Sequence, residues 1–333
     1  MIGHVGFTSP RFRGRVAVGT TLLLAFTAAC EDDVSRVLTI EATGVVQGFV
    51  YFDRNGSRVA DQGDTLLGGV RVRLTGRPGP VLTATSGADG GFTFAAAPVG
   101  RYTLAIDTTT LPGDSLTLTR ADPDSLLLGA RDSVAAEIGV GFPQLTVAQA
   151  RVAALGRKVV VVAVTLNDRN TFGDTTVHVA DTSAAIRTTR VLSPIVFTGD
   201  SVRVVGRRSE RDGQPTLDQA TMFTITIGAT PPTQALTTAL AALADSGRVD
   251  AALVRITDAV VGDTATVGAN RRLTVNDGSG PLEMQLDSLA GFTGAALAAD
   301  TIGARLDVTG LVVPAGNGSW RLKPRSPTDV VAN

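Results

Sequence analysis

Oxygen-bearing side chains recur at regular spacing directly after the apolar segment 45–52. With Asp53 as position 1 of a loop, candidate ligands fall at positions 1, 3, 5, 7, 9 and 12, with position 7 contributing its main-chain carbonyl. They are Asp53, Asn55, Ser57, Val59, Asp61 and Asp64. Calcium takes six to eight oxygen ligands, and a loop with this spacing brings them to one point. The spacing predicts a Ca²⁺ site with a Kd of about 10⁻⁴–10⁻³ M, the range of extracellular modules.

Two positions depart from the usual calcium loop. Position 6 is Arg58 rather than the glycine that makes the sharp turn, and position 12 is Asp64, whose side chain is shorter than the usual glutamate. Asp, Asn and Gly are also favoured in ordinary turns. A solvated loop between two strands therefore stays open as the alternative.

Few residues of this chain suit catalysis. Histidine occurs only as His4 and His178. Because side chains alternate along a strand, His178 lies opposite Val177 and Val179, and we expect it to face solvent. The sequence has no G-x-S-x-G elbow, no H-E-x-x-H zinc helix and no phosphate-binding loop. We expect a protein that is not an enzyme.

The one cysteine, Cys30, follows a segment typical of a secretion signal. Arg11, Arg13 and Arg15 precede the apolar segment 16–29. This segment is shorter than the roughly 20 residues that a membrane-spanning helix needs. The order predicts that residues 1–29 are a signal peptide and that the protein is exported.

The small residues before Cys30 resemble a lipobox, the motif in which the cysteine is acylated and becomes the new N-terminus. Thr27 stands where the motif prefers leucine. The resemblance implies a lipid anchor at Cys30 that holds the chain to the outer membrane or the cell surface, with residues 30–41 as acylated cysteine and tether. Two acyl chains are enough for stable anchoring. A cleavable signal with an incidental cysteine is the alternative.

Short strands must position the candidate residues. Hydrophobic residues make up 44% of the chain and aromatic residues 5%, and the net charge of −1 does not favour nucleic-acid binding. Apolar runs separated by Gly, Asp and Pro predict an all-β fold. Over residues 42–142 the runs recur about every ten residues, which is typical of a β-sandwich. The runs are 45–52, 70–74, 81–85, 92–94, 102–106 and 115–118.

Several strings in this region carry a family resemblance. They are GFVYFD at 48–53, GVRVRL at 69–74, DGGFTF at 89–94, PVGRYTL at 98–104 and GVGF at 139–142. Together they resemble the B-type repeats of serine-aspartate surface proteins and the related carboxypeptidase-regulatory-like, prealbumin-like modules. The resemblance implies a seven-stranded sandwich used as a stalk or adhesive module, and it favours the calcium interpretation of the loop.

Residues 143–230 and 231–333 look like two copies of one unit. Each has a strand, a second strand ending in an Asp-x-Ser turn, a strand ending in glycine and a closing strand. A short helix is predicted before the first strand of each copy, because Thr146 can cap residues 147–155 and Thr233 or Thr237 can cap the run that ends at Ala244.

Short curled strands predict a small closed barrel for each copy. The copies resemble tandem OB-fold-like domains of secreted bacterial proteins, most clearly in WRLKPRSPTDV at 320–330. OB folds bind ligands through basic and aromatic side chains. The candidates here are Arg187, Arg203, Arg207, Arg208 and Trp320. A solvated arginine-rich face is the alternative, since the chain has only two lysines and uses arginine almost everywhere.

Two hypotheses follow for function. The first is a non-catalytic exported lipoprotein that acts at the cell surface as a structural, adhesive or ligand-binding module, with an unidentified protein or glycan partner. The second is an extracellular nucleic-acid or carbohydrate binding protein that uses the barrel pair. Nucleic acid is the less favoured partner and stays open.

Overall fold

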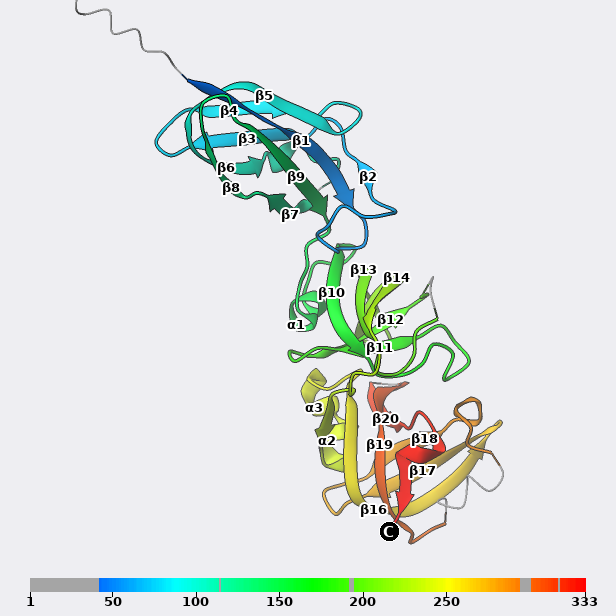
Figure 1. Cartoon of the computed structure of the whole chain (residues 1–333). Helices are drawn as coiled ribbons and strands as arrows, with labels where there is room; N and C mark the ends of the chain where they lie inside the picture. The colour runs from blue at the N-terminus through cyan, green and yellow to red at the C-terminus, as the bar shows by residue number, and fades with distance from the viewer. Residues whose placement is uncertain (1–41, 114, 192–194, 294–300, 317) are drawn as a thin grey trace, which may run out of the picture. The chain divides into compact units, whose positions relative to one another are not determined.

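The computed structural model describes residues 42–113, 115–191, 195–293, 301–316 and 318–333. Strands dominate these residues, which confirms the all-β class (Figure 1). Within the same ranges, no helix is long and apolar enough to cross a membrane. The predicted signal 1–29, Cys30 and the tether 30–41 lie outside the described residues.

Residues 43–141 form two sheets. The first has the strand order β2-β1-β9-β7, with β5 also paired to β1, and the second has the order β4-β3-β6-β8 (Figure 1). The strands are β1 Thr43–Asp53, β2 Thr65–Leu66, β3 Arg71–Gly76, β4 Val81–Thr85, β5 Gly91–Pro98, β6 Gly100–Ile106, β7 Thr117–Asp122, β8 Ser125–Leu128 and β9 Ser133–Gly141. The described sandwich therefore holds more strands than the seven that the resemblance implies, and β2 has only two residues.

Alternating apolar residues fill the space between these sheets. Val72 and Leu74 on β3 are buried, and the arginines beside them are exposed, as the two-residue period of a strand requires. Strands β1 and β9 run parallel, and they approach so closely that a Cβ on Gly48 would lie 1.8 Å from the Ala136 carbonyl oxygen. The well-packed strand β1 ends at Asp53 and so fixes the start of the loop 53–64.

Residues 158–226 form a closed barrel with the strand order β10-β11-β12-β14-β13. The strands are β10 Lys158–Thr165, β11 Val177–Ala180, β12 Ala185–Thr189, β13 Ser201–Arg211 and β14 Gln214–Thr226. Strands β12 and β14 are parallel, and the other neighbours are antiparallel. A closed barrel of five strands in which β14 lies between β12 and β13 has OB-type architecture.

Residues 253–323 repeat the same strand order. Strands β16, β17, β18, β20 and β19 are neighbours in turn, β16 also pairs with β19, and β18 is parallel to β20. The strands are β16 Leu253–Val267, β17 Asn270–Asn276, β18 Leu282–Leu286, β19 Arg305–Gly316 and β20 Ser319–Lys323, with β15 Thr233–Ala235 and β21 Val330–Ala332 at the edges. The repeat found in the sequence thus corresponds to two barrels of one topology.

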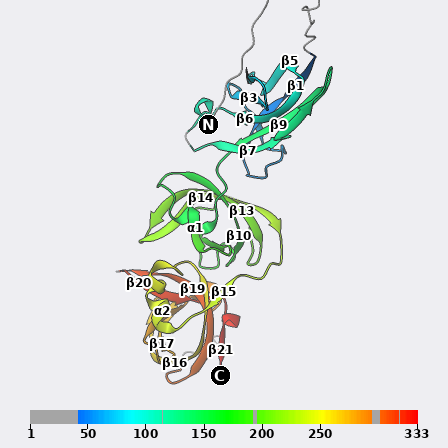
Figure 2. The same ribbon diagram turned by 90° about the vertical axis from the view of Figure 1, so that its left-hand side faces the viewer.

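The Asp-x-Ser turn of each barrel holds the helix that precedes it. The helices are α1 Val147–Arg151 and α2 Thr238–Ala242, with α3 Ala244–Gly247 following α2; α1 lies beside β10 (Figures 1 and 2). In each barrel the aspartate accepts the first helical N–H and the serine hydroxyl accepts the second. The pairs are Asp181 with Val147 at 2.8 Å, Ser183 with Ala148 at 3.0 Å, Asp277 with Thr238 at 3.1 Å and Ser279 with Ala239 at 3.1 Å. These bonds satisfy N–H groups that a helix N-terminus leaves unpaired.

The predicted caps at Thr146 and Thr237 are present. The predicted length of the first helix is wrong, because α1 ends at Arg151 rather than at residue 155. The Arg208 guanidinium donates to the Arg151 carbonyl at 2.8 Å. That carbonyl is therefore bonded by a side chain from β13, and the chain turns away towards β10.

The two barrels share part of a hydrophobic core. Residues 42–333 form one compact unit, and Leu166, Ala180 and Ala185 of the first barrel join the apolar cluster of the second. Arg151 on α1 forms an ion pair with Asp250, just before β16, and the two side chains are 12% and 2% exposed. Part of the outer surface of the first barrel is therefore covered by the second.

Candidate functional site

The first half of the loop 53–64 is closed by its own side chains. Asp53 is fully buried, and its Oδ2 accepts the N–H of Arg58 at 3.1 Å. The Asn55 Oδ1 accepts the N–H of Ser57 at 2.7 Å, while the Asn55 amide nitrogen donates to the Asp61 carboxylate at 3.0 and 3.2 Å. Turns closed in this way are typical of Asp and Asn, and they order the loop around Asp53.

The second half of the loop uses the remaining predicted ligands as hydrogen-bond acceptors. The Asp64 carboxylate accepts the N–H of Arg54 at 3.0 Å and that of Asp61 at 3.1 Å. The Val59 carbonyl accepts the Ser57 hydroxyl at 2.9 Å. Burial raises the pKa of Asp64. Burial, together with the nearby charge of Asp53, also raises the pKa of Tyr51 to about 12.

The loop meets some needs of a calcium site and not others. Arg58 has a φ of 63°, so position 6 makes the sharp turn without glycine. The buried Asp53 Oδ1 has no hydrogen-bond partner among the described residues. Asn55 turns its nitrogen rather than its oxygen towards Asp61, and nowhere in the described ranges do three His, Cys, Asp or Glu side chains group to hold a metal. Asp53 fits Ca²⁺ and Asn55 does not in this rotamer, so the calcium site stays a prediction.

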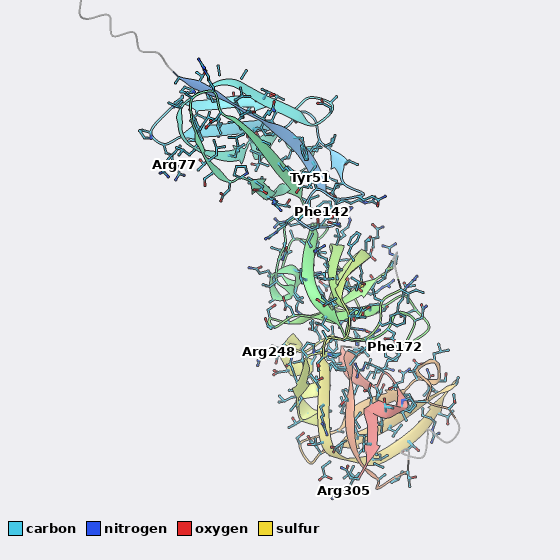
Figure 3. The ribbon with its side chains drawn as sticks, viewed as in Figure 1. Tyr51, Arg77, Phe142, Phe172, Arg248 and Arg305 are labelled. Carbon is cyan, nitrogen blue, oxygen red and sulfur yellow. The ribbon has the colours of Figure 1, made fainter. Side chains whose placement is uncertain are left out.

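A second candidate site lies where the first barrel meets β19 and β20. A cavity of about 170 Å³ is lined by Phe172, Asp174, Thr176, His178, Arg187, Asp212, Val313, Pro314 and Lys323. The first six come from the β10–β11 loop, from β11 and β12, and from the β13–β14 turn, and the last three come from β19 and β20. Figure 3 labels Phe172, on the β10–β11 loop. The face of the second and third strands, with the loops beside it, is the surface through which OB barrels bind ligands.

The hydrogen bonds of His178 fix its tautomer. Its ring Nδ1 lies 3.1 Å from Asn167 Oδ1, which also accepts the His178 main-chain N–H at 2.8 Å. The Asn167 amide nitrogen donates to the carbonyls of Asp168 at 2.9 Å and Thr176 at 3.1 Å, so the amide orientation is determined. Since Asn167 Oδ1 can only accept, Nδ1 carries the proton and Nε2 keeps its lone pair. Nε2 has no partner within the described part of the chain.

His178 is neutral at physiological pH. Burial lowers its pKa to about 3, and the positive charges of Arg187 and Lys323 act in the same direction. A neutral imidazole whose Nδ1 is protonated offers Nε2 as a hydrogen-bond acceptor. His178 lines the cavity and is 2% exposed, and its buried Nε2 is an acceptor that no described residue uses.

Each cation at the cavity has an acidic partner. Arg187 lies 3.3 Å from Asp212, and Lys323 lies 2.8 Å from Asp287. The Lys323 ammonium is also 3.9 Å from the centre of the Phe172 ring, a cation–π contact. The cavity wall thus combines donors and acceptors, with its positive charges already balanced.

The prediction that His178 faces solvent is wrong. Alternation correctly places Val177 and Val179 in the barrel core and His178 on the outer face. That outer face is covered by β19 and β20, a contact between barrels that the pattern of one strand does not reveal. Phe172 and Lys323 were also missed, and the only sequence signal for Lys323 is that it is one of two lysines.

The five side chains predicted to bind a ligand are spread over three strands. They are Arg187 on β12, Arg203, Arg207 and Arg208 on β13, and Trp320 on β20. Arg207 and Arg208 donate to main-chain carbonyls at 2.7 and 2.8 Å, and Trp320 packs on the core of the second barrel. Of these five, Arg187 alone lines the cavity.

Comparisons with known proteins give distant likenesses. No protein-family model matches the chain, and no curated protein sequence matches it. The chain is similar to a murine DNA binding protein bound with double-stranded DNA (12% identity, 52% of this chain and 96% of that chain, TM-score 0.28). It is also similar to the minor pilin of Streptococcus agalactiae (12%, 56% and 92%, 0.22) and to the Bacillus anthracis TIE protein (9%, 86% and 49%, 0.23). At these values the likenesses carry no conclusion about a ligand.

Proposed function

We propose that this chain is a non-catalytic, exported surface protein whose first barrel, closed by the second, binds a ligand at His178. The observation that carries the proposal is the buried Nε2 lone pair, which has no partner among the described residues and belongs to a side chain that lines the cavity. Buried polar groups in proteins nearly always have a hydrogen-bond partner. A bound ligand with a donor group would supply one.

The environment of His178 suits binding better than acid–base catalysis. A general base works best when its pKa lies near the ambient pH, whereas the pKa of His178 is about 3. Its Nδ1 is bonded to the Asn167 amide rather than to a carboxylate. The imidazole is therefore a fixed acceptor with little tendency to take up a proton.

A lipid anchor at Cys30 is part of the same proposal, and it rests on the lipobox-like sequence before that residue. Expressed in a bacterial host, the wild-type chain should take up labelled palmitate and sediment with membranes. Cys30→Ala should lose the label and move to the soluble fraction, with Cys30→Ser as the conservative control. Unlabelled wild-type protein in the soluble fraction would contradict the anchor.

A calcium-stabilised sandwich is a second candidate role, and it is favoured by the buried Asp53 Oδ1, for which the described part of the chain offers no hydrogen-bond partner. With a Kd of about 10⁻⁴–10⁻³ M, about 5 mM Ca²⁺ should stabilise the sandwich by about 1–2 kcal/mol. The melting temperature should then rise by several degrees against a chelator, and Asp53→Asn should abolish the rise. Asp89→Asn is the matched control, since Asp89 is an exposed loop aspartate that accepts the Gly91 N–H at 3.0 Å.

One binding screen tests the principal proposal. The full chain is presented with neutral and acidic glycans, cell-wall fragments, single-stranded DNA and RNA, at low and high salt and with or without calcium. We expect saturable binding to one class. Binding that weakens steeply with salt would indicate nucleic acid, and salt-independent binding would indicate a glycan. Failure to bind any class would overturn the proposed function.

A further inference from the structure

The free lone pair of His178 selects ligands that donate a hydrogen bond. Its Nδ1 proton is directed to Asn167, so the buried Nε2, in a side chain that lines the cavity, is an acceptor only. The phosphodiester of a nucleic acid backbone has acceptor oxygens and no donor, and it cannot pair with this nitrogen. A hydroxyl group can donate to Nε2 and still accept a bond from a neighbouring side chain.

The other polar groups of the cavity match a ligand that both donates and accepts. Asp174 accepts the Thr176 N–H at 2.9 Å and the Thr176 hydroxyl at 3.0 Å, and a carboxylate has further lone pairs to offer. Arg187 and Lys323 supply N–H donors, but each already faces a carboxylate. An added anion would meet three aspartates close by, whereas neutral hydroxyls can bond to acids and cations alike.

The apolar part of the wall limits the size and shape of the ligand. Phe172, Val313 and Pro314 line the cavity together with its polar groups. The volume of about 170 Å³ is below the range of about 300–1,000 Å³ typical of sites for drug-sized molecules. One saturated ring with a C–H face and several hydroxyls fits both the volume and the mixed lining.

We infer that the cavity at His178 binds a single neutral sugar ring, such as the end of a glycan chain. One hydroxyl donates to His178 Nε2, Arg187 and Asp174 engage neighbouring hydroxyls, and the apolar face of the ring packs on Phe172. The inference rests on the proposed binding function and names the ligand class of that same site. It also gives the second barrel a direct role in ligand binding, because Lys323 on β20 forms part of the cavity wall.

Nitrogen NMR of the full chain tests the inference at the atom concerned. The chain is labelled with ¹⁵N-histidine and titrated with methyl glycosides of glucose, galactose, mannose and N-acetylglucosamine, and separately with an oligothymidylate. The free Nε2 should resonate as an unprotonated ring nitrogen and shift upfield when a hydroxyl donates to it. At least one glycoside should produce this saturable shift, and the oligothymidylate should not.

Variants establish that the binding is at this cavity. His178→Phe keeps a ring but removes the lone pair, and it should weaken glycoside affinity by about tenfold or more. Lys323→Gln should also weaken it. Lys158→Gln is the matched control, because Lys158 likewise lies over a phenylalanine, 5.2 Å from the Phe142 ring centre, and does not line the cavity. Thermal melts check that each variant is folded.

The outcomes separate this inference from the function on which it rests. Glycoside binding that leaves the His178 nitrogen unchanged and survives His178→Phe would overturn His178 as the site, here and in the proposed function, but keep ligand binding by the chain. A nitrogen shift caused only by the oligothymidylate would keep the site and overturn the ligand class. No glycoside binding, with capture of another class in the wider screen, would overturn the inference alone, and no binding at all would overturn both.

Discussion

The strand pair β11–β12 of the first barrel and the pair β17–β18 of the second occupy the same place in the strand order but carry different side chains. When the two Asp-x-Ser turns are aligned, His178 corresponds to Thr274 and Arg187 corresponds to Glu283. Each pair is directly opposed across its two strands, and residues on either side of it point into the barrel core. One topology therefore presents two different polar pairs at one position.

The consequence is that the polar pair of the first barrel lines a cavity, whereas Glu283 of the second barrel is paired with arginines of the chain itself. In the second barrel, Glu283 lies 3.1 Å from Arg321 and 3.7 Å from Arg272, so its charge is balanced by neighbouring strands. In the first barrel, Arg187 pairs with the exposed Asp212, and the imidazole opposite has an acceptor that no residue in the described ranges uses. The barrel supplies the positions, and the residues at them determine whether a site exists.

The largest effect should come from breaking the contact that the first helix makes and the second does not. Arg151 on α1 reaches Asp250, whereas the equivalent residue of α2 is Ala242. Arg151→Ala should lower the free energy of unfolding by about 3–5 kcal/mol, because the Asp250 carboxylate stays buried without its cation. Urea unfolding measures the change. Arg248→Ala is the control, since Arg248 is 80% exposed, and its loss should cost less than about 1 kcal/mol. Equal losses would contradict the account of the interface.

Replacing the histidine of the first barrel by the threonine of the second should remove a dependence of stability on pH. The pKa of His178 falls from 6.5 to about 3 on folding. Between these two values, the imidazole is protonated in the unfolded chain and neutral in the folded chain. Stability is complete above about pH 6.5 and declines by about 1.4 kcal/mol per pH unit as pH falls towards 3. Between pH 6.5 and 4 the wild type should lose about 3 kcal/mol more than His178→Thr. Urea unfolding across this range measures the difference, and parallel pH profiles would refute it.

The sequence predicted the strands well where one strand has one exposed and one buried face. The run 81–85 matches β4 at both ends, and the run 70–74 contains Val72 and Leu74, which β3 buries. Strand β8 was missed, because SLLL has no alternation and follows a short turn. The repeat of two barrels could be predicted from the sequence because turn residues such as Asp181 and Asp277 recur in the same order.

The candidate cavity could not be predicted from the sequence in the same way. His178 was noticed, but its neighbours Lys323 and Pro314 lie far along the chain and reach it only through packing of one barrel on the other. The lone pair depends on the orientation of the Asn167 amide, which two carbonyls fix. Neither contact produces a recognisable pattern of residue spacing in the sequence. The loop 53–64 could be predicted because its candidate ligands lie in one short segment at regular spacing.

The Asp-x-Ser turns should behave alike in the two barrels. Burial raises the pKa of Asp277, but hydrogen bonds from Ser279 and Thr238 outweigh it and lower the pKa to about 2. The stability that this carboxylate gives is complete above about pH 4 and is lost as pH falls towards 2. Allowing for its partial exposure, Asp277→Asn should lower the free energy of unfolding by about 1–2 kcal/mol at pH 7 and much less at pH 2. Asp181→Asn should act in the same direction, since hydrogen bonds lower the pKa of Asp181 as well; opposite responses would break the equivalence of the turns.

The smallest effect concerns the two helix caps, where the barrels differ slightly. Thr146 forms a reciprocal box with Gln149, accepting its N–H at 3.3 Å while the Gln149 side chain accepts the Thr146 N–H at 3.0 Å. Thr237 has only the first of these two bonds, in which its hydroxyl accepts the Leu240 N–H at 3.4 Å. Thr146→Ala should therefore cost about 1 kcal/mol and Thr237→Ala about 0.5 kcal/mol.

The difference between the caps can be removed by a second substitution. Gln149→Ala leaves Thr146 with only the bond in which its hydroxyl accepts the N–H three residues on. Thr237 in the second barrel has the same single bond. In that background Thr146→Ala should cost about 0.5 kcal/mol, as Thr237→Ala does, because the reciprocal bond is gone from both comparisons. If Thr146→Ala still cost twice as much, the extra stability would come from the turn at Asp181 and not from the box. The two helices would then differ in how their barrels hold them, although the strand order around them is the same.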